Sequence, residues 1–186
     1  MRRFRVDKAK AVEAILYVAA RLDDPSFHRI SKILYFADLD HLERYGRLIT
    51  GDTYYAMEYG PVPSYAYDAM KDARGNHPSS DLVANAFDAA GMYHVRPLRE
   101  AAVDFFSKSE LECFDAAIAE RSDKSFGQLA DESHDAAWHA TAEDSPMNLD
   151  DIVSVRRQNI SDRGSPDLRE YLAHLGGHSS NLLLIV

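Results

Sequence analysis

Apolar residues recur every three or four positions in two long segments near the start of the chain. From residue 7 to 22 this spacing predicts an amphipathic helix with Asp7 near its N-cap. Residues 27–45 are apolar around most of the helical circumference, which indicates a central buried helix. Gly46 is well placed to end this helix in the left-handed conformation.

Shorter elements follow the second helix. The aromatic-rich run at 53–59 is typical of a short strand, and residues 60–64 predict a rigid corner because they combine glycine with two prolines. Ser64 is expected to cap a helix that continues to about residue 73. A turn at 88–91 is expected before a second strand at 92–97.

The later part of the chain predicts two more helices and then a weaker pattern. Ser107 and Glu110 form a capping-box pattern before a helix at 108–119, and residues 125–134 predict another helix. We therefore expect an α+β fold, mainly α-helical, in which a compact helical domain at 1–143 carries a small antiparallel β-sheet. Residues 144–186 form a C-terminal extension with a Gly-Ser-Pro linker, a short helix and an apolar end.

Composition and the single cysteine restrict the class of protein. Apolar residues make up 46% and charged residues 27% of 186 residues, the usual balance of a soluble globular protein. Every apolar run is far shorter than the roughly twenty residues that span a membrane. Cys113 is the only cysteine, which excludes an internal disulfide and a cysteine-built zinc site. We expect a reduced, cytoplasmic protein without contact to a membrane.

The net charge of −9 is unevenly distributed. Residues 1–99 hold 14 Lys and Arg against 13 Asp and Glu, whereas residues 100–186 hold 7 against 17. The acidic second half repels nucleic acid and favours a basic partner surface, or it simply keeps the protein soluble. Five cations lie within the first ten residues, and Arg2, Arg3 and Arg5 form their cluster. Because this is a small basic footprint on an acidic chain, we expect weak or no binding to nucleic acid.

Signals for catalysis are few. The sequence lacks a phosphate-binding glycine loop, a nucleophile elbow and a zinc-binding His-Glu-x-x-His helix. Asp38 with His41, and Asp131 with His134, have the i,i+3 spacing of metal ligands on one helical face, but further inward carboxylates do not stand out. The alternative is that Asp38 and His41 make a local polar contact. We expect neither a cofactor nor a metal ion.

Four segments in the first half, and one in the second, share a pattern with a known family. They are Ile30-Ser31-Lys32-Ile33-Leu34-Tyr35-Phe36-Ala37-Asp38, His41-Leu42-Glu43-Arg44-Tyr45-Gly46-Arg47, Thr50-Gly51-Asp52, Tyr59-Gly60-Pro61-Val62-Pro63-Ser64, and His134 with Trp138. In this order and spacing, the chain resembles the Panacea domain, the SocA-like antitoxin family that is also found among phage-associated proteins. The resemblance extends over about residues 5–140.

The resemblance implies a non-enzymatic antitoxin that neutralises a cognate toxin, encoded beside it, by binding it directly. It also implies a mainly helical domain with a small antiparallel sheet. Two other functions stay open: a DNA-binding regulator with a winged-helix-like arrangement, since two helices precede an aromatic strand, and a metal-dependent hydrolase. A homo-oligomer is also compatible with the sequence.

The family motif divides into expected scaffold residues and expected contact residues. Tyrosine is a large, rigid side chain with a polar tip, which suits an interface, although the same rings could cover the domain's own sheet. The expected scaffold residues are Lys32, Gly51, Asp52, Gly60, Pro61, Val62, Pro63, His134 and Trp138. The expected partner-binding residues are Tyr35, Asp38, His41, Tyr45, Tyr55, Tyr59, Leu182, Leu183 and Leu184.

Overall fold

The computed structural model describes residues 5–75 and 80–148. The linker, short helix and apolar end expected after residue 148 lie outside the described residues. The elements are, in order, α1 (Lys8–Ala19), α2 (Phe27–Tyr45), β1 (Tyr54–Met57), β2 (Gly60–Pro63), α3 (Ser64–Asp72), α4 (Asp81–Ala84), β3 (Phe87–Ala90), β4 (His94–Pro97), the 3₁₀ turn η1 (Val103–Phe105), α5 (Lys108–Arg121), α6 (Phe126–Ser133), α7 (Ala136–His139) and β5 (Ser145–Pro146).

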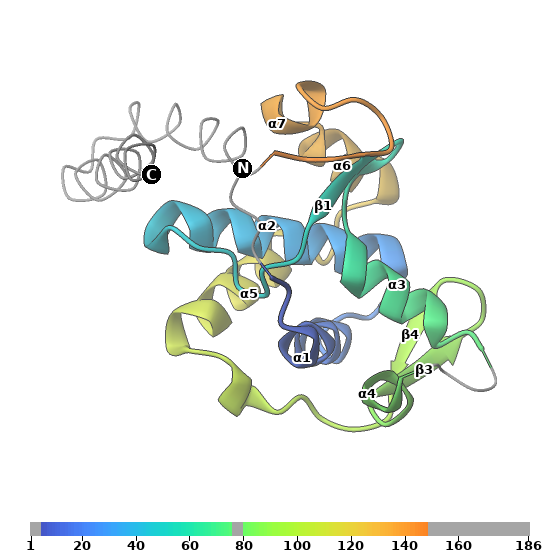
Figure 1. Ribbon diagram of the computed structural model, residues 1–186. Coiled ribbons are helices and arrows are strands. Elements are labelled where there is room, and N and C mark those ends of the chain that lie inside the picture. The colour runs from blue at the N-terminus through green and yellow to red at the C-terminus, as the bar shows by residue number, and fades with distance from the viewer. Residues whose placement is uncertain (1–4, 76–79, 149–186) are drawn as a thin grey trace, which may run out of the picture.

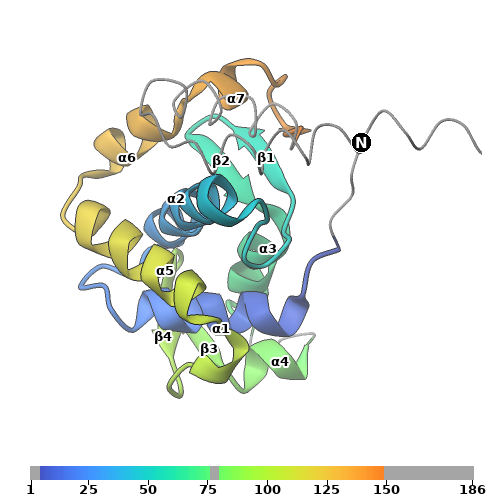
Figure 2. The same cartoon turned by 90° about the vertical axis from the view of Figure 1, so that its left-hand side faces the viewer.

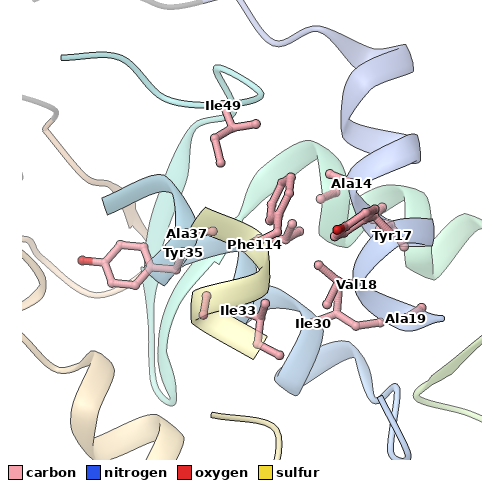
Figure 3. Packing of buried hydrophobic residues seen from close by; sticks show 14 of the residues in the cluster. Ala14, Tyr17, Val18, Ala19, Ile30, Ile33, Tyr35, Ala37, Ile49 and Phe114 are labelled. Carbon is pink, nitrogen blue, oxygen red and sulfur yellow. The ribbon is translucent and has the colours of Figure 1, made fainter. Parts of the chain in front are cut away.

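Helix α2 is the central element, as its apolar circumference predicts. Figures 1 and 2 show it between α1, α3, α5 and the β1–β2 hairpin. Figure 3 shows part of the resulting core, where side chains of α1, α2 and α5, among them Tyr17, Ile33 and Phe114, pack together. The Tyr17 and Phe114 ring centroids are 5.7 Å apart, a contact that adds to the area these rings bury.

The predicted start of the first helix and both predicted ends of the second helix are confirmed. The Asp7 side chain accepts a hydrogen bond of 3.0 Å from the backbone amide of Lys10 at the start of α1. Ser26 accepts from the amide of Arg29 at the start of α2, and Gly46 ends α2 with a φ of 70°. α1 ends at Ala19, three residues earlier than predicted.

The first sheet has the strand order β2-β1-β5, with both pairs antiparallel. The predicted rigid corner at 60–64 is wrong, because Gly60–Pro63 is strand β2 and the chain reverses at Glu58 and Tyr59 instead. Pro61 and Pro63 lack an amide hydrogen, and the sheet accommodates them because β2 is an edge strand.

The second hairpin also differs from the prediction. The expected turn at 88–91 falls largely within β3, which pairs with β4 from Phe87 opposite Pro97 to Ala90 opposite His94. The run Asp-Ala-Ala has poor strand propensity, but the hairpin is anchored by the buried side chains of Phe87 and Val95. Burial of these two side chains therefore outweighs the local preference.

The later helices follow their caps. Ser107 and Glu110 form the predicted capping box of α5, which extends two residues beyond the predicted end. Ser125 and Gln128 form a second capping box at the start of α6. The elements α4, α7 and β5 have four residues or fewer, and hydrophobic periodicity does not reveal segments this short.

The structure confirms the fold class, a mainly α-helical α+β fold with small antiparallel sheets. The boundary at residue 143 stays a prediction, although β5 at 145–146 comes from the segment assigned to the extension and completes the first sheet. Met147 is buried and donates its backbone amide to the carbonyl of Tyr54 at 2.7 Å. Over the described ranges, no helix is both long and apolar enough to cross a bilayer.

Candidate partner-binding surface

Lys32 lies inside the molecule, where α2 faces the β1–β2 hairpin. Its Nζ atom donates a hydrogen bond of 2.9 Å to the backbone carbonyl of Pro61, and its side chain is fully buried. Burial disfavours the charged ammonium and lowers the pKa of Lys32 to about 7. This lysine therefore ties α2 to the start of β2 through a single backbone oxygen.

Gly60 occupies the narrowest part of the same region. Its φ is +92°, and a Cβ atom placed on it would lie 2.1 Å from Ser133 Oγ and 2.9 Å from Lys32 Nζ. Ser133 is buried at the end of α6, where its hydroxyl donates to the carbonyl of Ala130 at 2.9 Å. Only glycine fits both the backbone conformation and the space, so this position fixes the hairpin against α2 and α6.

Asp38 and His41 are also buried, but they bind different partners. Asp38 accepts hydrogen bonds of 2.6 Å from the Tyr54 hydroxyl and 2.6 Å from the Ile49 amide, and desolvation raises the pKa of this carboxyl to about 7. His41 Nδ1 lies 2.9 Å from the carbonyl of Arg47, and burial lowers the pKa of the imidazole. The expected local contact between Asp38 and His41 is therefore replaced by bonds to the segment that follows α2.

Asp52 takes the capping role that we assigned to Ser64. Its carboxylate accepts hydrogen bonds from the amides of Tyr65 at 3.0 Å and Ala66 at 2.9 Å, both in the first turn of α3. It also accepts from the amide of Thr53 at 2.8 Å, and burial raises the pKa of Asp52. Ser64 is instead the first residue of the helix, and its N-cap Pro63 has no side-chain bond.

A second set of contacts holds α7 against α2 and the hairpin. The Tyr35 hydroxyl donates to Asp135 Oδ2 at 2.7 Å, and Asp135 in turn accepts from the amides of Ala137 and Trp138. The Trp138 ring stacks on His134 with centroids 3.8 Å apart, and its Nε1 atom donates to the carbonyl of Met57 at 3.0 Å. The last residue of β1 is thereby joined to α7.

Exposed apolar side chains gather at the tip of the hairpin. We call Met57, Tyr59, Phe126 and Trp138 the hairpin-tip patch; the first three are 36%, 51% and 50% exposed, and Trp138 is partly buried. The Tyr59 and Phe126 centroids are 5.2 Å apart. The ring of His28 stacks on the ring of Phe126, with their centroids 3.8 Å apart.

The groups around the patch are acidic. Glu58 lies in the turn, and its carboxylate at the hydroxyl of Tyr59 raises the pKa of that tyrosine. Glu143 and Asp144 are exposed in the loop after α7, and the Asp144 amide donates to the carbonyl of Ala56 at 2.8 Å. Figure 1 shows this loop beside the end of the hairpin. Burial lowers the pKa of His28 to about 4, so this ring adds no positive charge at neutral pH.

A family model describes most of this architecture. The model of the Panacea domain of SocA-like antitoxins matches residues 30–139. The chain belongs to this family. No curated protein and no solved structure matches the chain.

The Panacea match contains both the buried polar residues and the hairpin-tip patch. Of the expected scaffold residues, Lys32, Gly60 and Pro61 meet where α2 faces the turn end of the hairpin, and Asp52 caps α3 at the other end of the hairpin. His134 stacks on Trp138 at α7. Gly51 precedes the capping Asp52 with a φ of 69°. Val62 and Pro63 belong to β2, opposite Tyr55 and Tyr54.

The expected contact residues separate into buried and exposed groups. Tyr35, Asp38 and His41 are buried and bonded within this Panacea domain, and their role in partner binding stays a prediction. Tyr59 and Tyr45 are exposed, and Tyr55 is partly buried. Leu182, Leu183 and Leu184 lie outside the described residues.

Several important residues escaped the sequence interpretation. Ser133 packs α6 against Gly60, Asp135 fixes α7 to α2, and Phe126 contributes one of the exposed rings of the hairpin-tip patch. Asp135 could have been found because it precedes a short run of helix-forming residues and is a favoured N-cap type. For Ser133 and Phe126 the sequence carries no such signal, since their roles depend on how α6 packs on the hairpin.

Proposed function

We propose that this protein is an antitoxin that neutralises a cognate toxin by binding it directly, without catalysing a reaction. Membership of the SocA-like antitoxin family supports the general role. The supporting observation from the structure is the distribution of the motif residues. The polar groups of Lys32, Asp38 and Asp52 are buried and form hydrogen bonds within the domain. Aromatic side chains are exposed at the hairpin tip.

This distribution suits binding better than catalysis. A catalytic carboxylate or lysine has to reach a substrate, whereas Asp38 and Lys32 are enclosed and bonded to a tyrosine hydroxyl and a backbone carbonyl. Within the described parts of the chain, no three His, Cys, Asp or Glu side chains are grouped as metal ligands. Exposed Tyr, Phe and Met side chains are typical of the centres of protein–protein interfaces.

A titration in cells tests the proposal. The gene beside this one would be expressed from an inducible promoter in a host that lacks both genes, while the full chain is supplied at increasing levels. A binding antitoxin restores growth only when its amount reaches that of the toxin, because each copy neutralises a fixed number of toxin molecules. Both proteins would be quantified by calibrated immunoblot.

Other outcomes point to other functions. Full rescue at a small fraction of the toxin level, with the toxin chemically altered, indicates an enzyme and contradicts the proposal. Rescue that requires the native promoter of the toxin gene indicates a DNA-binding regulator. A neighbouring product that is harmless in the absence of this chain also contradicts the proposal.

A further inference from the structure

We propose that the toxin docks on the hairpin-tip patch through a positively charged segment, with an arginine or lysine over the rings of Tyr59 and Phe126. This inference rests on the proposed function and specifies where and how the partner binds. The patch combines an exposed aromatic area, a surrounding negative charge and a rigid support.

The aromatic area is continuous across two elements. Tyr59 comes from the β1–β2 turn and Phe126 from the first residue of α6, and their rings meet edge to face. Met57 extends the surface along β1, and Trp138 is joined to the carbonyl of Met57. Side chains of this type, gathered at one place, are those that provide most of the binding energy in interfaces.

The charge around the patch selects a cationic partner. From residue 120 to 148 the chain carries seven Asp and Glu against two cations, and both cations, Arg121 and Lys124, pair with Glu132. Glu58, Glu143 and Asp144 are exposed at the hairpin tip. A guanidinium or ammonium group gains from both the carboxylates and the faces of the aromatic rings, so this surface favours Arg and Lys over acidic or neutral side chains.

The patch is supported from below by contacts that restrict its motion. Gly60, the residue after Tyr59, packs closely against Ser133 and Lys32, and Lys32 is bonded to the carbonyl of Pro61. His28 stacks against Phe126. A surface held in its binding conformation loses less conformational entropy when a partner binds. The buried motif residues therefore position the exposed patch without touching the toxin themselves.

The other exposed tyrosine of the motif lies in different surroundings. Tyr45 is 41% exposed at the end of α2, between Arg44 and Arg47 in the sequence, and both arginines are exposed. Arg47 is paired with Glu110 and Arg44 adds a second exposed cation, so a cationic segment gains less there than at the hairpin tip. A cationic partner is therefore expected to bind at the hairpin-tip patch and not at the surface around Tyr45.

Binding measurements on the full chain test the inference. The probe is the purified product of the neighbouring gene, once the chain has been shown to suppress its lethality. Tyr59→Ala, Phe126→Ala and Glu58→Lys are compared with matched controls on other surfaces. Phe105→Ala removes a ring that is 44% exposed in η1, Glu100→Lys reverses an exposed charge, and Tyr45→Ala tests the rival surface.

The inference predicts that Tyr59→Ala, Phe126→Ala and Glu58→Lys, together called the patch variants, each weaken binding at least tenfold. The three other variants should stay within about threefold of the wild type. The loss caused by Glu58→Lys should shrink as salt is added, because salt screens exposed charges. Thermal denaturation serves as the folding control, and Glu58→Lys keeps the test decisive if a ring deletion lowers the melting temperature.

Three results would overturn the docking site while leaving the antitoxin function intact. The first is neutralisation and binding unchanged in all patch variants. The second is a loss of binding with Tyr45→Ala instead. The third is a patch variant that converts a dimer of the chain into a monomer by light scattering but binds the probe normally, which would show that the patch pairs two copies. A neighbouring product that the chain does not suppress contradicts the proposed function itself.

Discussion

At the scale of single residues, the polar groups of the motif determine how α2 meets the hairpin. Gly60 and Lys32 are the most demanding of these positions, because one requires empty space and the other brings a titratable amine into the core. Two predictions about stability follow from them.

Replacing Gly60 with alanine should lower the free energy of unfolding by about 3 kcal/mol. The new Cβ would overlap Ser133 Oγ, and the φ of +92° is unfavourable for any residue with a side chain. Urea denaturation measures the effect. Gly127→Ala is the matched control, because nothing lies within 4 Å of its Cβ position in α6, and there alanine should be neutral or stabilising by about 0.5–1 kcal/mol. A Gly60→Ala protein as stable as the wild type would contradict this description of the joint.

Lys32 should make stability increase with pH above neutrality. Its pKa is lowered from 10.5 to about 7 in the folded protein, so between these values the unfolded chain holds a proton that the folded chain has released. The free energy of unfolding therefore rises with pH in this range, by about 2 kcal/mol between pH 7 and 9. Lys32→Met removes this contribution, and the two stabilities should diverge as the pH is raised in urea titrations. Parallel pH profiles would show that the Lys32 pKa is not lowered.

At the scale of elements, capping by a distant residue holds α3 in place. Asp52→Ala leaves the amides of Thr53, Tyr65 and Ala66 without their acceptor and should cost about 2–3 kcal/mol. Hydrogen exchange should show the loss first at the Tyr65 and Ala66 amides. Asp68→Ala, on the exposed side of the same helix, is the control and should cost less than about 0.5 kcal/mol. Unchanged exchange at both amides would exclude Asp52 as the cap.

The long helices were predictable because their caps and periodicity agree with their packing. Ser107 with Glu110, Gly46, and the apolar circumference of α2 each carry a local signal that the fold retains. The sequence of strand β2 predicts a corner because its two prolines are turn residues in most settings. Only its place at the sheet edge makes them compatible with a strand. The hairpin-tip patch was predictable only in part: Tyr59 and Trp138 belong to the motif, whereas Phe126 reaches the patch through the packing of α6.

At the scale of the whole molecule, the chain combines a rigid domain with an acidic surface at one end of the hairpin. A partner that matches this surface should be basic, and long-range attraction should speed its association at low salt. The C-terminal residues expected to bind the partner lie outside the described part, so their role stays a prediction.

Ending the chain after Gly177 removes Leu182, Leu183 and Leu184 and tests that role. If these leucines bind the toxin, the shortened protein keeps the melting temperature of the full chain but neutralises less toxin. Differential scanning fluorimetry and the growth titration measure the two quantities on the same variant. A protein that loses several degrees of stability and still neutralises would assign the tail to the domain's own core.

The most direct test of direct neutralisation is native mass spectrometry of the full chain co-expressed with the product of the neighbouring gene. Direct binding predicts one complex of fixed stoichiometry that contains both proteins with unmodified masses, and Glu58→Lys should reduce its abundance relative to Glu100→Lys. Two separate proteins, or a toxin whose mass has changed, would contradict the account.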